Sequence, residues 1–113
     1  MALKIEDIRL MKRYFEGVMS RANHHADKVN EIILALAGGV IWRGADIGVR
    51  TYRDKTANML WMKTDTGKVY CFIFNHNTGK IEVHEDSMNG RLLWEFSNEN
   101  SLPEVKGIFS KMK

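Results

Sequence analysis

The chain of 113 residues contains one cysteine, one proline and no long apolar run. With Cys71 alone, an internal disulfide framework and a cysteine-rich zinc module are both excluded. The longest apolar run, residues 32–37, is much shorter than the roughly 20 residues that a membrane span needs, and no apolar signal core begins the chain. These absences predict a soluble cytoplasmic protein without a membrane partner, and the length predicts a single domain over residues 1–113.

Charge is balanced overall but unevenly distributed along the chain. Lys and Arg outnumber Asp and Glu by 17 to 14, which gives a net charge of +3. Residues 43–68 carry six basic and three acidic side chains, whereas residues 80–104 carry two basic and six acidic ones. So small an excess is not a nucleic-acid signature by itself, although the basic middle segment leaves that function open.

The first third of the chain has the apolar spacing of a helix. The apolar positions follow a three-then-four spacing and are Ile8, Met11, Phe15, Val18, Ala22, Val29, Ile32 and Leu36. The pattern fits one long helix or two helices that meet near residues 17–23. Gly38 and Gly39 then predict the end of the helical region, because glycine is the usual residue just past a helix.

After Gly39 the pattern changes to short runs of β-branched and aromatic residues separated by turn residues. The predicted strands are residues 40–43, 47–53, 58–64, 68–75, 80–85 and 91–97. Connections this short force neighbouring strands to pair antiparallel. Ser101 and Glu104 have capping-box spacing and begin a C-terminal helix. The fold class is therefore α+β, with N-terminal helices packed on a curved antiparallel meander of five or six strands, followed by a C-terminal helix.

The central strands are apolar on both faces. Side chains alternate between faces, so residues 69, 71 and 73 form one set and Tyr70, Phe72 and Phe74 the other, while Met59 and Trp61 share a face of the preceding strand. Helices on one side cover only one set. The second set must meet another copy of the protein, a ligand cavity or the curl of the sheet itself. We predict a homodimer or partner interface that includes Met59, Trp61 and one set of the aromatic residues.

Glu82 and His84 form the one carboxylate and histidine cluster that the sequence suggests. They lie two residues apart on one strand face, a spacing that can supply a base and its orienting carboxylate or a solvated strand face. No nucleophile motif, phosphate-binding glycine loop or metal-ligand spacing is present, which predicts no cofactor and no metal. The sequence favours a non-enzymatic binding module. The alternative is a small-molecule binding protein or enzyme with a cavity under the helices, in which Glu82 and His84, or His25, provide the polar groups.

Cations and aromatic residues alternate in the basic middle segment. Such a mixture can stack bases on a sheet, and the candidate nucleic-acid contacts are Arg50, Tyr52, Arg53, Lys55 and Lys63. Exposed strands also carry such charges as protection against edge pairing.

The stretch HNTGKIEVHEDSMNGRLLWEF, together with the size and the lack of catalytic motifs, resembles the small α+β proteins of integron gene cassettes. The resemblance implies a bacterial, soluble and often oligomeric protein of unknown role, and it assigns no functional residue. The layout of helices against a curved sheet is also similar to cone-shaped folds with an interior ligand pocket, a likeness of fold that assigns no function.

Overall fold

The computed structural model describes residues 9, 12–13, 15–16, 28–52 and 55–113. Within residues 28–52 and 55–113, two helices and five strands follow one another along the chain. They are α2 (Ile33–Arg43), β1 (Asp46–Tyr52), β2 (Lys55–Lys63), β3 (Val69–Asn75), β4 (Lys80–Glu85), β5 (Leu92–Phe96) and α3 (Leu102–Ser110). The predicted α+β class is therefore confirmed. The described residues among 9–16 are helical, but the choice between one N-terminal helix and two falls outside the described residues.

The five strands form one antiparallel sheet in sequence order, from β1 to β5. This meander was predicted, because each connection between strands is too short to cross the sheet. Gly67 and Gly79 have positive φ angles of 88° and 72°, which suits the two tight turns on either side of β3. In the turn between β4 and β5 the positive φ of 65° falls on Asp86 instead of Gly90.

Helix α2 differs from the prediction in extent. It continues through Gly38 and Gly39 to Arg43, so the expected first strand at residues 40–43 is wrong. Position 39 requires a glycine for a different reason: a Cβ atom there would lie 2.5 Å from the ring of Phe109 in α3. Gly39 is thus a point of close helix approach and does not end the helix. Arg43 links the end of α2 to the residues that follow α3, because its Nη2 donates a 2.6 Å hydrogen bond to the carbonyl of Met112.

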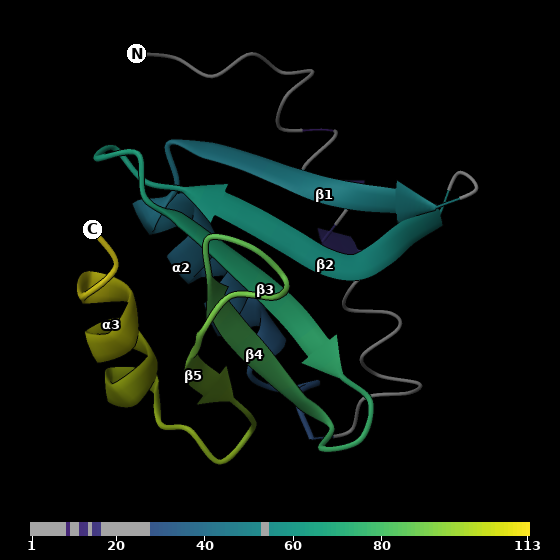
Figure 1. Cartoon of the computed structure of the whole chain (residues 1–113). Coiled ribbons are helices and arrows are strands. Elements are labelled where there is room, and N and C mark those ends of the chain that lie inside the picture. The colour runs from purple at the N-terminus through teal and green to yellow at the C-terminus, as the bar shows by residue number, and fades with distance from the viewer. Residues whose placement is uncertain (1–8, 10–11, 14, 17–27, 53–54) are drawn as a thin grey trace.

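Both helices cover the same face of the sheet, and Figure 1 shows α2 behind the central strands. Cross-strand pairing places Leu60, Phe72 and Val83 in one row of this core face. The Phe109 ring from α3 stacks on Phe72 and Phe96 at centroid distances of 5.9 and 5.7 Å. Buried residues of both layers form the core, namely Val29, Ile32, Leu36, Val40, Leu60, Met62, Tyr70, Phe72, Ile81, Val83, Phe96, Val105, Phe109 and Met112.

Helix α3 begins where the sequence predicts. Ser101 accepts a hydrogen bond from the backbone N–H of Glu104, and the Glu104 side chain accepts one from the backbone of Ser101. This reciprocal capping box satisfies two N–H groups that the first turn of a helix leaves without partners. Val105, Phe109 and Met112 are buried, but Leu102, the first residue of the helix, is 69% exposed.

Candidate interaction surfaces

The face of the sheet opposite the helices, here called the second face, carries Met59, Trp61 and Ile73. Cross-strand pairing sets Trp61 beside Cys71 and Met59 beside Ile73 on this side. These three apolar side chains are partly buried. The second face is therefore apolar, as predicted, and the apolar set that β3 contributes to it is Val69, Cys71 and Ile73.

The aromatic set of β3 lies on the core face. Tyr70 and Phe72 are buried under the helices, and Phe74 packs against the same core. As candidates for a second-face interface, Tyr70, Phe72 and Phe74 are therefore corrected to core residues. Alternation along β3 left both assignments open, because all six side chains from Val69 to Phe74 are apolar. Because α2 and α3 cover the face that carries Tyr70, Phe72 and Phe74, that face is the core.

The Trp61 indole lies close to the backbone of β1. It is paired with Gly48, and a Cβ atom added to Gly48 would lie 2.1 Å from Cε2 of the indole. Glycine in a strand often marks such a close approach, and an aromatic neighbour then covers the bare backbone. The contact accounts for the partial burial of Trp61 within the chain itself.

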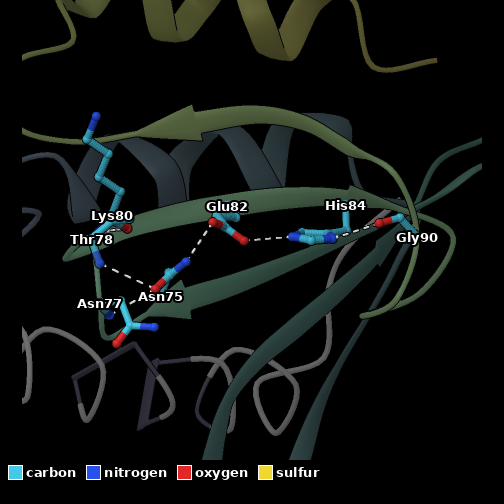
Figure 2. A network of polar contacts seen from close by, with 7 residues as sticks. All are labelled: Asn75, Asn77, Thr78, Lys80, Glu82, His84 and Gly90. Atoms are coloured by element: carbon cyan, nitrogen blue, oxygen red, sulfur yellow. Dashed lines mark hydrogen bonds and ion pairs between the residues drawn. The ribbon is translucent and has the colours of Figure 1, made fainter.

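A polar network runs along β4 on the second face (Figure 2). Asn75 Nδ2 donates to Glu82 Oε2 at 2.8 Å, and Glu82 Oε1 lies 2.8 Å from His84 Nε2. His84 Nδ1 lies 2.9 Å from the carbonyl oxygen of Gly90. The network therefore connects the turn before β4, where Asn75 Oδ1 accepts from the N–H of Asn77, to the loop that follows β4.

With Glu82 ionised, the two hydrogen bonds of the His84 ring form together only when the ring is doubly protonated. Both partners of the ring, the Glu82 carboxylate and the Gly90 carbonyl, are hydrogen-bond acceptors, so both ring nitrogens must donate. Partial burial opposes this charge, but the hydrogen bonds to Glu82 and Gly90 outweigh it and raise the pKa of His84. The hydrogen bonds from His84 and Asn75 lower the pKa of Glu82. Because both side chains are only 16% exposed and already paired, they are arranged as a structural ion pair.

Cys71 is the neighbour of His84 across β3 and β4. Its thiol is buried, and that burial, followed by the negative charge of Asp86, raises the pKa of Cys71. A reactive cysteine needs the opposite shift, because the thiolate is the nucleophile. The arrangement of Cys71, His84 and Glu82 therefore does not resemble an activated cysteine.

Among the described residues, the four most exposed large apolar side chains lie on the helices, at a surface that the sequence did not predict. Leu34, Ile41 and Trp42 of α2 are 67%, 52% and 51% exposed, and Leu102 of α3 is 69% exposed. Together with Gly38 between them, these four residues form what we call the α2–α3 surface. A groove of about 210 Å³ runs between the two helices and is lined by Ala35, Gly38, Gly39, Trp42, Leu102, Val105, Lys106 and Phe109.

Two signals in the sequence pointed towards this surface. Ile41 and Trp42 fall outside the inward stripe that Leu36 continues, and Leu102 is the first residue after the helix cap. These two signals indicate a shared surface only if residues 40–43 are helical, because a strand would place Ile41 and Trp42 on opposite faces. Because the sequence predicts that the helix ends at Gly38 and Gly39, it does not predict this surface.

A family model described as integron cassette protein VCH_CASS1 chain matches residues 11–106. The chain belongs to this integron cassette protein family. Membership confirms the predicted resemblance and covers most of the chain, from the N-terminal region into α3. A comparison with curated proteins finds no match.

The nucleic-acid candidates of this cassette protein are only partly described. The backbones of Arg50, Tyr52 and Lys55 lie in β1 and β2, but their side chains and the whole of Arg53 fall outside the described residues. Lys63 is exposed at the end of β2. The described residues thus leave nucleic-acid binding as a prediction.

In the described part of the cassette protein, no cluster of three or more His, Cys, Asp or Glu side chains is arranged to hold a metal ion. No helix within the same residues has the length and apolar character to cross a membrane.

Proposed function

We propose that this cassette protein is a non-enzymatic interaction module that binds another protein through the α2–α3 surface. The observation that carries the proposal is the exposure of Trp42 and Leu102, each at least half exposed, on the walls of one groove, together with the exposed Leu34 on the same helix as Trp42. Contiguous exposed apolar side chains on a small domain are typical of protein contact sites. Covering one large side chain contributes roughly 1.5 to 3 kcal/mol, so burying this group would stabilise a complex by several kcal/mol.

The groove is better suited to a protein side chain than to a small ligand. Its volume of about 210 Å³ is below the roughly 300 to 1,000 Å³ of pockets that bind small molecules. Lys106 is the one charged residue in its lining, so few polar groups converge on an occupant. Both properties favour the flat, apolar contact of a partner helix over the alternative of a small-molecule binding protein.

The second face is a second candidate interface, and it is the one that the sequence predicts. Met59, Trp61 and Ile73 support it, because they remain partly exposed on the side opposite the helices. Their burial within the chain is greater than that of the α2–α3 surface, since Trp61 already packs on Gly48. A partner would therefore gain less by covering them.

Site-specific photocrosslinking in the host cell tests the proposal. A photoreactive amino acid at position 34 or 102 should give an adduct of defined mass, and mass spectrometry should identify the residue to which it is joined. Position 65, an exposed turn residue between β2 and β3, is the matched control and should give none. Equal labelling at positions 34, 102 and 65, or none at 34 and 102, would exclude the α2–α3 surface as a contact site.

A further inference from the structure

We infer that the partner at the α2–α3 surface is a second copy of this chain, with the two α2 helices antiparallel and crossing at Gly38. This inference rests on the proposed function and names its partner. Three features of α2 support it independently: a glycine that the chain itself does not require, apolar side chains spaced evenly on both sides of that glycine, and charges of opposite sign at the two ends.

Gly38 is unexplained by packing within the chain. A Cβ atom on Gly39 would overlap the Phe109 ring, but a Cβ atom on Gly38 would have no neighbour within 4 Å. A glycine inside an exposed helix lowers helix stability relative to alanine. An isolated chain would therefore fold better with alanine at position 38. A bare backbone there is useful when a second helix approaches closely from outside.

The apolar residues are spaced as a twofold-symmetric contact requires. In such a contact, residue i of one copy meets residue j of the other, and residue j meets residue i. Leu34 lies four residues before Gly38 and Trp42 lies four residues after it. When two antiparallel helices cross at Gly38, Leu34 of each copy faces Trp42 of the other copy. Each of these two contacts lies about one helical turn, 5.4 Å, from the crossing point.

The groove between α2 and α3 extends this contact to the second helix. Trp42 forms one wall of the groove and Leu102 of α3 another. Because the partner subunit's Leu34 would approach Trp42 across the crossing, it lies at the position from which a leucine side chain can enter the groove. Entry would also cover Leu102, whose exposure nothing else in the described chain explains.

Charges at the two ends of α2 have opposite signs. Glu31 is exposed two residues before α2 begins, and Arg43 is the last residue of α2, with its guanidinium hydrogen-bonded to the Met112 carbonyl and 5.2 Å from the centre of the Trp42 ring. An antiparallel arrangement brings the partner subunit's Glu31 to within about one helical turn of Arg43. Each end of the contact then combines an acidic and a basic side chain, whereas a parallel arrangement would place like charges together.

The decisive measurement is molar mass by light scattering over a range of protein concentration, with two matched variants. The wild type should reach twice the chain mass of 13.1 kDa. Gly38→Glu should raise the dissociation constant more than about 100-fold, because it places an unpaired charge at the crossing point. Gly107→Glu is the control: Gly107 also lies inside a helix with open space at its Cβ position, but it does not line the groove. Gly107→Glu should remain dimeric.

Circular dichroism of each variant separates a lost contact from a lost fold. If Gly38→Glu does not fold, Leu34→Glu replaces it, because Leu34 is largely exposed and its loss leaves the core intact. A wild type that is monomeric at every concentration would overturn the inference, as would a folded Gly38→Glu variant that remains dimeric. The photocrosslinking experiment distinguishes this inference from the proposed function. Crosslinks from position 34 to a different protein would support the interaction module and exclude the second copy as its partner.

Discussion

The two faces of the sheet are built from the same strands and from similar apolar side chains, yet they differ in how they are covered. On the core face, Phe72 lies under α3 and stacks on Phe109. On the second face, Ile73 and Trp61 are only partly buried, and a polar network runs beside them along β4. Hydrophobicity alone therefore does not distinguish the faces of β3. The helices determine which face becomes the core.

The largest expected difference between the faces is in the loss of unfolding free energy when adjacent residues of β3 are replaced by alanine. Phe72→Ala should lower the free energy of unfolding by about 3 to 5 kcal/mol, because it removes buried apolar area and leaves a cavity against Phe109. Ile73→Ala should cost only about 1 kcal/mol, since the side chain is partly exposed. Urea denaturation of both variants measures the difference. Equal losses would contradict the assignment of the faces.

The helical layer over the core face depends on Gly39. Gly39→Ala should lower the free energy of unfolding by about 1 to 3 kcal/mol, because the new methyl group meets the Phe109 ring and separates α2 from α3. Gly107→Ala, with open space at the Cβ position, should raise it by about 0.5 to 1 kcal/mol. Thermal unfolding of both variants should show shifts of opposite sign. Two shifts of the same sign would exclude steric contact at Gly39 as the cause.

The contribution of the second face to the stability of the protein should depend on pH through His84 and Glu82. A raised pKa means that the His84 contribution is complete below about pH 6.5, its usual value, and is lost as pH rises through the folded value. The lowered pKa of Glu82 means that its contribution is present above its usual value of about 4.3 and is lost as pH falls through the folded value. The pair should therefore stabilise the protein most between about pH 4.3 and 6.5.

The variant His84→Gln tests this dependence. It should lower the free energy of unfolding by about 1.5 kcal/mol at pH 5.5, the magnitude of a charge-assisted hydrogen bond. The difference from the wild type should shrink as pH increases through the folded pKa of His84. NMR titration of the His84 ring follows the same protonation directly. A difference that grew with pH would show that the neutral ring is the stabilising form.

A small loss of stability is also expected at the start of α3. Ser101→Ala should lower the free energy of unfolding by about 1 kcal/mol, because the N–H of Glu104 loses its acceptor. Ser101→Asp is the matched control, since aspartate is also a good N-cap residue and should retain most of the stability. Denaturation curves of the two variants, recorded side by side, measure the contribution of the cap to the helical layer.

Local patterns in the sequence predicted much of this architecture. Residues 80–85 were predicted as a strand and form β4, because alternating apolar side chains, with Ile81 and Val83 inward, end at turns on both sides. The capping box of α3 was also predicted, since its donors and acceptors lie within four residues. The pairing of Glu82 with His84 required only that both lie on one face of one strand. Each of these features depends on neighbours along the chain.

Other features of the protein depend on contacts between segments that are distant along the chain. Gly38 and Gly39 are identical as local signals, yet the Phe109 ring, 70 residues further along the chain, makes close approach the role of Gly39 and leaves Gly38 open. Likewise, the alternation of residues in β3 predicts two apolar faces, but the packing of α2 and α3 makes one of them the core. The physical reason is that burial is a property of the assembled layers, whereas alternation and capping are properties of the chain.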